Sequence, residues 1–343
     1  MEELEKINTD RVEGFLNLDS YFRKSLGRDY IDEEDLYING LIELEQSGIS
    51  NKFWILSSDG EKKALFKEQQ FGSDEAYAEL LSEEVAKLLN MPTAHYDLAT
   101  FNGNKGVISY NFIQEYDSYT PGFDIIADFY EKKLEDNEEL SQLYGIDYYK
   151  DSIEEVCNKL NNLEDVWCIL EDKFKDHYNK DYIVPKIVDG LVDKLIFDIL
   201  MVNIDRHSDN WGVLDSTENG KMASPQFDNS RIMNLHMNIL VEKFTSNETM
   251  QDKELLFNVD NSNIRKPLEV LEHFLNISSS EYRDRVRDKV AILQEHIDDI
   301  PSIIEKRTEY PMPEYLKKYF NVNMKEHLNK VSEIVDGKEK RHK

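Results

Sequence analysis

The segment that most constrains the fold of this chain lies at residues 203–212 and reads Asn-Ile-Asp-Arg-His-Ser-Asp-Asn-Trp-Gly. It follows an apolar stretch, residues 187–202, whose apolar positions recur with the spacing of a largely buried helix. A short apolar run, a turn and a second acidic site, Phe227-Asp228-Asn229, come next. The spacing of Asp205 and Asn210 is weak evidence alone, because both residue types are common in loops. The order of helix, loop, strand, turn, strand and aspartate gives the pattern its specificity.

This order suits phosphoryl transfer. In kinases of the protein-kinase-like fold, one aspartate orients the attacking hydroxyl and takes its proton, and an asparagine one loop later holds a metal. A second aspartate, beyond a short hairpin, holds the bridging magnesium. These roles would fall to Asp205, Asn210 and Asp228. The alternative interpretation is a structural loop whose polar residues cap neighbouring helices.

The same residues carry a family resemblance. Asp-Arg-His-x-x-Asn-Trp-Gly at residues 205–212, followed by Phe-Asp at 227–228, is similar to the catalytic signature of HipA-like serine/threonine kinases. The order Asp-Arg-His replaces the His-Arg-Asp of ordinary eukaryotic protein kinases. Phosphoinositide lipid kinases share a related Asp-Arg-His-x-x-Asn, so the motif identifies a superfamily better than a substrate.

The resemblance covers roughly residues 40–300 and implies an α+β, bilobal protein-kinase-like fold. We expect a small N-lobe made of an antiparallel sheet with one helix, and a larger, mainly helical C-lobe. ATP and Mg²⁺ are the implied cofactors. His207 would organise the loop, whereas Arg206 would either neutralise the transferred phosphate or anchor an activating segment.

The pattern along the chain predicts four parts. They are a helical, acidic lead-in at 1–38, the N-lobe at 39–116, the C-lobe at 117–335 and a basic tail at 336–343. Within the N-lobe, apolar runs at 41–44, 53–57 and 63–66 predict three strands. A helix is expected at 74–90, with Ser73 as its N-cap. Two further apolar runs, at 96–101 and 106–112, predict a hairpin. In the C-lobe, Pro185 is expected to open the buried helix, and residues 264–300 predict two further amphipathic helices.

A lysine at the end of the third expected strand is the candidate phosphate ligand. Ala64-Leu65-Phe66 precedes Lys67, which in a kinase would contact the α- and β-phosphates. An exposed strand-end lysine is the alternative. The resemblance points to Glu83 as its acidic partner on the following helix, although helical geometry places Glu84 nearer the apolar stripe and Glu79 is a third option.

The loop between the first two strands, residues 45–52, is the candidate phosphate-covering loop. It has a single glycine, Gly48, and departs from the Gly-x-Gly-x-x-Gly of eukaryotic protein kinases. HipA-like kinases resemble this, with a short serine-containing loop. The resemblance implies that Ser47 or Ser50 is autophosphorylated, which would displace the loop and silence the enzyme. A plain hairpin turn is the alternative.

Composition limits the partners and the compartment. The formal charge of −28 argues against nucleic acid or an anionic bilayer as the principal partner, because both would be repelled. No apolar run approaches the ~20 residues of a membrane span, and no secretory signal is visible at the N-terminus. The two cysteines, Cys157 and Cys168, lack metal-ligand spacing and are typical of a reducing compartment, so a cytoplasmic location is expected. The sequence does not predict an oligomeric state.

The sequence therefore predicts an ATP- and magnesium-dependent kinase acting on a serine or threonine hydroxyl of a protein. Two alternatives stay open: a kinase of the same fold acting on a small molecule or lipid head group, and a pseudokinase that binds nucleotide as a scaffold. Asp228-Asn229-Ser230 keeps the metal-binding aspartate of Asp-Phe-Gly but lacks its phenylalanine and glycine. Regulation by the Asp-Phe-Gly flip is therefore not expected.

Overall fold

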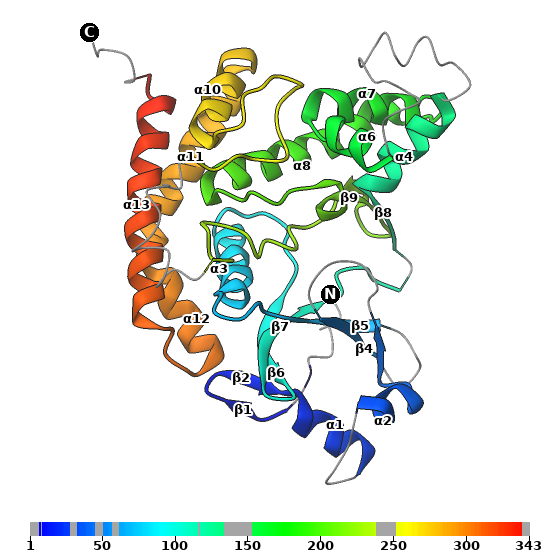
Figure 1. The fold of residues 1–343 in the computed structure, drawn as a ribbon. Helices are drawn as coiled ribbons and strands as arrows, with labels where there is room; N and C mark the ends of the chain where they lie inside the picture. The colour runs from blue at the N-terminus through cyan, green and yellow to red at the C-terminus, as the bar shows by residue number, and fades with distance from the viewer. Residues whose placement is uncertain are drawn as a thin grey trace. The chain divides into compact units, whose positions relative to one another are not determined.

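The chain divides into two compact units, each described here by itself. The structure, a computed structural model, describes residues 7, 9–27, 33–44, 51–56, 62–115, 117–133, 153–237 and 252–337 (Figure 1). Unit 1 comprises residues 1–112, 234–246 and 295–323, and unit 2 comprises residues 113–233, 247–294 and 324–343. The change at residue 113 lies close to the expected lobe boundary, but residues 295–323 return to unit 1 instead of staying in the C-lobe.

Unit 1 is built on a seven-stranded sheet. Its strands are β1 (Arg11–Val12), β2 (Phe15–Asn17), β3 (Ile42–Leu44), β4 (Lys52–Leu56), β5 (Lys62–Glu68), β6 (Tyr96–Phe101) and β7 (Asn104–Tyr110). They lie in the order β1-β2-β6-β7-β5-β4-β3, and all neighbours are antiparallel except β2 and β6. The sheet is therefore mixed and not purely antiparallel, because the lead-in adds a hairpin at its edge. Asn102 and Gly103 turn the β6–β7 hairpin with positive φ angles of 50° and 79°, the geometry of a type I′ turn.

The lead-in is only partly helical. Its two strands precede α1 (Leu18–Leu26) and α2 (Glu33–Ile38). Asn17 caps α1 by accepting a hydrogen bond from the Ser20 amide at 3.0 Å, and Gly27 ends it in the left-handed region. The lead-in forms strands where Phe15 and Leu16 enter the core, which overrides the acidic, helix-like composition.

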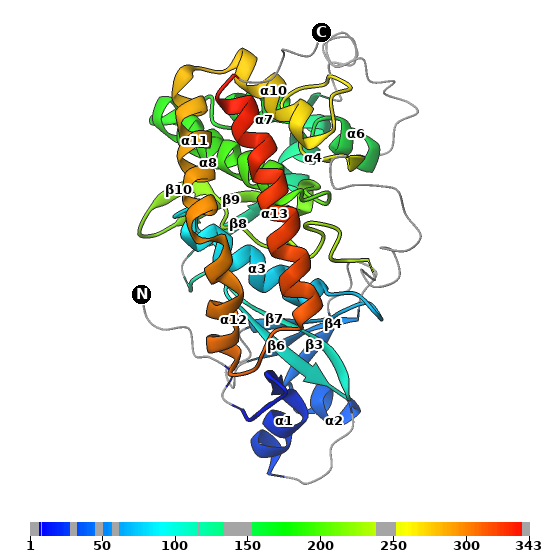
Figure 2. The same ribbon diagram turned by 90° about the vertical axis from the view of Figure 1, so that its left-hand side faces the viewer.

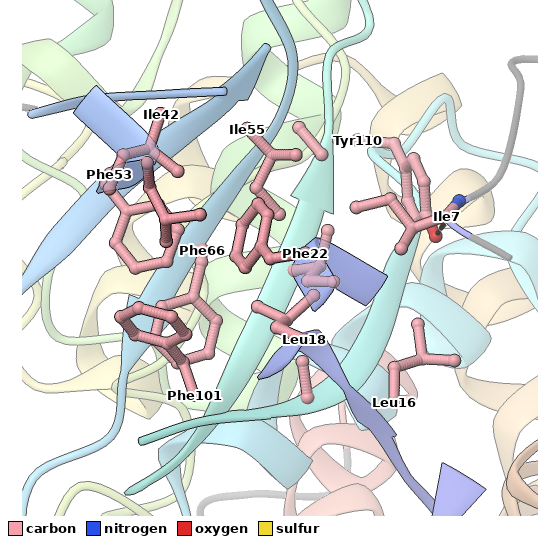
Figure 3. Close-up of a cluster of buried hydrophobic side chains, with 14 residues drawn as sticks. Ile7, Leu16, Leu18, Phe22, Ile42, Phe53, Ile55, Phe66, Phe101 and Tyr110 are labelled. Atoms are coloured by element: carbon pink, nitrogen blue, oxygen red, sulfur yellow. Dashed lines mark hydrogen bonds between the residues drawn. The ribbon is translucent and has the colours of Figure 1, made fainter. Parts of the chain in front are cut away.

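One face of the sheet packs on this lead-in through an aromatic core (Figure 3). Phe22 of α1 lies with its ring centroid 5.8 Å from Phe101 and 6.5 Å from Phe53. Phe53 and Phe101 are 4.9 Å apart in an edge-on arrangement. The packed rings bury this face of the sheet against α1.

The other face of the sheet carries α3 (Glu75–Leu88), which contacts β6, β7 and α12 (Ile300–Thr308) (Figure 2). Ser73 does not cap this helix. Asp74 occupies the N-cap position, and the Ser73 hydroxyl donates to the Gln70 carbonyl at 2.8 Å. After α12, the chain continues through the linker 309–313 into α13 (Glu314–Val335), and the first ten residues of α13 belong to unit 1.

Unit 2 is mainly helical, with one small sheet. The helices among its described residues are α4 (Gly122–Lys133), α6 (Ile153–Lys159), α7 (Leu163–Lys173), α8 (Lys180–Met201), α10 (Pro267–Ile277), α11 (Ser280–His296) and the remainder of α13. The last two residues of α11 belong to unit 1. A short 3-10 turn, η2 (Ser208–Asn210), lies in unit 2, and another, η4 (Ile297–Asp299), lies in unit 1. Strands β8 (Ser118–Pro121), β9 (Gly212–Ser216) and β10 (Gly220–Ala223) form an antiparallel sheet in the order β10-β9-β8.

Helix α8 leads into the 203–212 segment. It begins at Lys180, so Pro185 lies inside it and does not open it. Ile183 and Val184 are already buried, which extends the apolar stripe, and hence the helix, towards the N-terminus. The helix ends at Met201, and its C-cap residue Val202 has a φ of 49°, which is unusual for a β-branched residue. Among the described residues, no helix is both long and apolar enough to cross a bilayer.

Candidate active site

Asn203 connects the end of α8 to two other segments of unit 2. Its side chain is fully buried, and its Nδ2 donates to Asp198 Oδ1 at 3.0 Å and to Asn229 Oδ1 at 3.2 Å. Its Oδ1 accepts from the Asp205 amide at 3.2 Å. One side chain therefore sets the position of the backbone that carries Asp205.

Arg206 holds the loop and the Asp228 segment together. Its guanidinium is fully buried. It donates to Asp198 Oδ1 and Oδ2, the Asn210 carbonyl, the Phe227 carbonyl, Gln226 Oε1 and Asn229 Oδ1, at distances between 2.6 and 3.1 Å. Of the two roles open for Arg206 from the sequence, these contacts favour anchoring, because a guanidinium occupied in this way cannot swing towards a phosphate.

Trp211 of the motif is a packing residue. It is fully buried, and its Nε1 donates to Asn161 Oδ1 at 2.7 Å. The Nδ2 of Asn161 donates in turn to the Arg206 carbonyl at 2.8 Å. A Cβ added at Gly122 of α4 would lie 2.4 Å from the indole, so the glycine is needed for this approach. Asn161 therefore holds the motif at both Arg206 and Trp211, and Gly122 of α4 packs against the indole of Trp211.

Asp205 keeps part of its side chain accessible. Its carboxylate is about a quarter exposed, and Oδ2 lies 3.3 Å from Arg231 Nε. Its carbonyl accepts from the His207 amide and from Asn210 Nδ2, both at 2.8 Å. Because the Asn210 amide nitrogen is turned towards this carbonyl, its Oδ1 is the atom left to meet a cation.

The loop has a negative electrostatic environment. His207 Nδ1 accepts from the Asp209 amide at 3.3 Å and caps η2. Burial acts to lower the pKa of His207, but the hydrogen bond with Asp209 and the charges of Asp205, Asp209 and Asp228 outweigh it and raise that pKa. Three carboxylates therefore act on one side chain, and this favours a cation beside the loop.

Asp228 adopts a left-handed backbone with φ of 49°, in a segment whose neighbours are held by Arg206. Aspartate tolerates this conformation better than most residues. Among the described residues, no three His, Cys, Asp or Glu side chains gather into a metal-binding group. A magnesium site of the kinase type does not need such a group, because the ion keeps several waters and binds substrate phosphates. The Asn210 amide oxygen and the Asp228 carboxylate are hard oxygen donors, of the kind that would suit such an ion.

Two charged residues of α8 that lie outside the motif, Asp198 and Lys194, contact the segments around Asp205 and Asp228. Asp198 is fully buried against Arg206. Lys194 is buried one turn earlier and donates to the Pro225 carbonyl at 2.7 Å. Burial and the charge of Arg206 lower the pKa of Lys194 well below its usual range, although Asp198 opposes them. The signal was present: two charges interrupt an otherwise apolar helix face.

Lys67 lies on the α3 face of the sheet of unit 1. It pairs in register with Val107 of β7, and the next residues along both strands, Phe66 and Ile108, belong to the aromatic core on the opposite face. Side chains alternate along a strand, so Lys67 points away from that core. This is the face on which a kinase lysine is expected.

Glu83 is fully buried in α3. It contacts His95 Nδ1 at 2.6 Å, Lys87 Nζ at 2.7 Å and Arg307 at 2.8 Å, and it accepts from the Tyr96 amide at 3.1 Å. Burial acts to raise the pKa of Glu83, but His95, Arg307 and Lys87 lower it to about 2.

These contacts leave the pairing of Lys67 with Glu83 a prediction. Arg307 of α12 also reaches Glu84 at 2.6 Å, so both glutamates take part in the contact of α3 with α12. Glu79, the third option, is buried one turn earlier. The loop serines Ser47 and Ser50, with Gly48, lie outside the described residues, and their roles also stay predictions.

No protein-family model and no curated protein sequence matches this chain. Solved structures do match. The Helicobacter pylori proinflammatory kinase CtkA superposes with a TM-score of 0.58 over 86% of this chain and 96% of its own, at 16% identity. HipA of the Shewanella oneidensis MR-1 toxin–antitoxin system, solved with HipB and operator DNA, gives a TM-score of 0.50 over 97% of this chain and 75% of its own, at 14% identity. At such identities the likeness establishes the fold, and the predicted HipA-like kinase fold is confirmed: this chain is a mixed α/β protein with that fold.

Proposed function

We propose that the chain is an ATP- and magnesium-dependent kinase that transfers the γ-phosphate to a serine or threonine hydroxyl of a protein. The observation that carries the proposal is the network of Arg206. It holds the carbonyl of Asn210 and the carbonyl of Phe227, the residue before Asp228. A network that fixes both segments at once is what a paired metal site requires, and it is more than helix capping needs.

Each candidate residue then has a role that its surroundings support. Asp205, on the loop held by Asn203, orients the acceptor hydroxyl and takes its proton. Asn210 and Asp228 hold magnesium, which when bound neutralises charge on the phosphate oxygens. Lys67 holds the α- and β-phosphates. Positioning and charge neutralisation supply most of the rate, so no covalent intermediate with the enzyme is needed.

Three further assignments belong to the same proposal. Glu83 orients Lys67, and backbone amides and hydroxyls of Ser47, Gly48 and Ser50 cover the phosphates. Autophosphorylation of Ser47 or Ser50 silences the enzyme. A cytoplasmic location and a protein acceptor complete it.

The decisive experiment follows the label of [γ-³²P]ATP. Wild-type protein and Asp205→Asn are incubated with labelled ATP and magnesium, alone and with cell lysate, and phosphosites are mapped by mass spectrometry. Label on serine or threonine of lysate proteins, absent with the variant, supports the proposal. Label only in the small-molecule or lipid fraction indicates the alternative acceptor. Intact ATP binding without turnover under every metal condition indicates a pseudokinase.

Nucleic acid is a separate question. The charge of −28 disfavours it as a partner, whereas the Shewanella oneidensis HipA was solved in a complex that includes operator DNA. We infer that this chain alone does not bind DNA. A mobility-shift titration with random-sequence duplex at low salt tests this, and a retarded band at micromolar protein contradicts it.

A further inference from the structure

Unit 1 contains a cavity that none of the candidate catalytic residues within the described part of the chain lines. Its volume is about 680 Å³, within the ~300–1,000 Å³ range of small-molecule sites. Four segments form it: the β1–β2 hairpin, the segment from the end of β5 into α3, the start of β7 at Lys105, and the linker from α12 with the start of α13.

The cavity has a well-defined wall. Gly14 of the hairpin has a φ of +84°, and a Cβ placed there would lie 2.6 Å from Tyr310 Cβ, so the hairpin contacts the linker directly. Thr308 Oγ1 donates to the Tyr310 carbonyl at 3.1 Å, and the Met312 amide donates to Glu305 Oε1 at 2.9 Å. Pro311 and Pro313 restrict the linker further. The linker is therefore held in place by specific contacts.

The cavity contains the buried carboxylate of Asp74. Asp74 is 8% exposed, and its Oδ1 accepts from the neutral Tyr315 hydroxyl at 2.7 Å. Within the part of the chain that the structure describes, no lysine, arginine or histidine nitrogen lies at ion-pair distance from it. Burial raises the pKa of Asp74, and the Tyr315 hydrogen bond only partly opposes this. A buried carboxylate of this kind is stabilised by an arriving positive charge.

The two lysines in the cavity lining already have acidic partners. Lys105 lies 4.0 Å from Glu13 Oε2 and 4.8 Å from the centre of the Phe15 ring. Lys317 pairs with Glu305 at 3.0 Å and with Glu314 at 2.9 Å. Neither therefore turns the cavity into an anion site.

Aromatic side chains complete the lining. Phe15 and Tyr77 meet edge to face with centroids 6.4 Å apart, and Tyr310 and Tyr315 line the same cavity. Burial, together with Asp74, Tyr310 and Glu305, raises the pKa of Tyr77 to about 12, so this ring stays neutral at physiological pH. Neutral aromatic rings around a carboxylate attract organic cations through their faces and accommodate an apolar stem.

We propose that this cavity binds an organic cation, a primary ammonium or guanidinium group on an apolar or flat stem, with Asp74 as its counter-ion. The cation can come from a free small amine or from a lysine or arginine side chain of a polypeptide. The site is independent of phosphoryl transfer and stands whether or not the chain is a kinase.

The test compares a charged probe with its neutral analogue. Wild-type full-length protein is titrated by calorimetry with benzylamine and with benzyl alcohol at pH 7. We expect benzylamine to bind at least about tenfold more tightly, as for a partly desolvated ion pair worth about 1.4 kcal/mol or more. Asp74→Asn removes this preference. The control, Asp10→Asn, keeps it, because Asp10 is 75% exposed, pairs with Lys24 and is not among the residues that line the cavity. Equal affinity of the two probes for wild type, or an unchanged preference in Asp74→Asn, overturns the proposal.

The source of the cation is read from a second set of probes, N-acetyl-lysine-N-methylamide and N-acetyl-arginine-N-methylamide. Tighter binding of either than of benzylamine assigns the site to a polypeptide side chain, and the reverse assigns it to a free amine.

Proton release tests the proposal without an Asp74 variant, should Asp74→Asn fail to fold. An arriving cation favours ionised Asp74, so benzylamine binding releases protons at pH values above the ordinary pKa of aspartate, where the raised pKa keeps part of Asp74 protonated. Calorimetry in buffers of different ionisation enthalpy detects this release. Tyr315 of α13 and Tyr77 of α3 face Asp74, and burial raises the pKa of both, so neither loses a proton in acid. Glu13 and Glu314 also line the cavity, and Glu13→Gln and Glu314→Gln should each release as many protons as wild type if Asp74 is the source. Benzyl alcohol releases none. Benzylamine binding without proton release contradicts the role of Asp74.

Discussion

Arg206 and Asp198 form a two-point ion pair in the interior of unit 2, with Nε to Oδ2 at 3.0 Å and Nη2 to Oδ1 at 2.9 Å. Neither side chain is exposed. The pair joins the last turns of α8 to the loop that carries Asp205 and Asn210. Its geometry matches the planar fork of arginine to a carboxylate, which a lysine cannot reproduce.

Arg206→Met is expected to destabilise the protein strongly, because it leaves Asp198 buried without its arginine partner. The expected loss is about 3 kcal/mol or more in the free energy of unfolding. Urea unfolding at pH 7, followed by tryptophan fluorescence, measures it. Lys330→Met, which breaks an exposed pair with Glu326 in the same unit, is the control and should cost less than about 1 kcal/mol. Similar losses of unfolding free energy in the two variants would show that the buried pair stabilises the protein no more than an exposed pair does.

Asp205→Asn is expected to leave the fold and ATP affinity nearly unchanged while phosphoryl transfer falls at least about 10²-fold, the size typical of the loss of a general base. The carboxylate acts on the hydroxyl and not on the nucleotide. Initial rates with labelled ATP provide the measurement. Asp209→Asn, on the same loop but 61% exposed, is the matched control and should retain most of the activity. A rate above half of wild type for Asp205→Asn would remove Asp205 from the mechanism.

Asp228→Ala is expected to weaken ATP binding only when magnesium is present, because it deletes a metal ligand. Calorimetric titration of ATP with and without magnesium separates the two effects. Asp215→Ala on β9 serves as control, since that carboxylate pairs with Lys221 outside the loop. If magnesium changes ATP affinity equally in wild type and Asp228→Ala, the assignment is wrong.

Glu83 should make stability depend on acid pH. Its pKa is lowered from 4.5 to about 2 in the folded protein, so its contribution is complete above about pH 4.5 and is lost as the pH falls through about 2. The shift corresponds to roughly 3 kcal/mol. Urea unfolding at pH 6, 4 and 2.5 should show the difference between wild type and Glu83→Gln shrinking as the pH falls. Glu326→Gln, at an exposed position, should show a much smaller difference throughout. A difference independent of pH would exclude the ionised carboxylate as its cause.

The loop serines give a prediction that rests on the sequence alone. A phosphate on Ser47 or Ser50 would add about two negative charges next to ATP, and repulsion should disfavour nucleotide binding. Ser47→Asp or Ser50→Asp should therefore weaken ATP binding, while alanine at the same positions is mild. Equal ATP affinity for aspartate and alanine variants at both sites contradicts this. Mass spectrometry of protein that has turned over ATP tests the autophosphorylation itself.

Local pattern predicted the elements of the fold well where periodicity was strong. The β6–β7 hairpin and the buried run of α8 follow from alternation and helical spacing. The same spacing also indicates the α13 helix, which the sequence analysis does not predict. Its buried positions recur every three or four residues, at Leu316, Phe320, Met324, Leu328, Val331 and Val335. Pro185 does not mark the start of α8, because the buried apolar stripe that continues towards Lys180 outweighs the hydrogen bond lost at the proline.

Long-range pairing was beyond the reach of the sequence. The spacing along α3 indicates Lys87 as a cationic partner of Glu83, but nothing near Glu83 indicates that a second one is Arg307, 224 residues later. Likewise, the choice between phosphate neutralisation and anchoring for Arg206 depends on whether its guanidinium is buried. The neighbouring residues in the sequence do not determine that burial. The motif predicts Asp205, Asn210 and Asp228 as candidate site residues, and these stay predictions. The contacts of Asp198, Asn203 and Asn161 with this segment are visible only in the structure.

The return of residues 295–323 to unit 1 has a consequence for biosynthesis. Glu83 and Glu84 are buried in α3, and Arg307 reaches both from α12. While the ribosome has not yet released α12, the nascent N-terminal segment can form its sheet but holds these two carboxylates without that arginine. Contacts of such large sequence separation form late and slowly. Unit 1 should therefore complete its folding only after nearly the whole chain, including most of unit 2, has been synthesised.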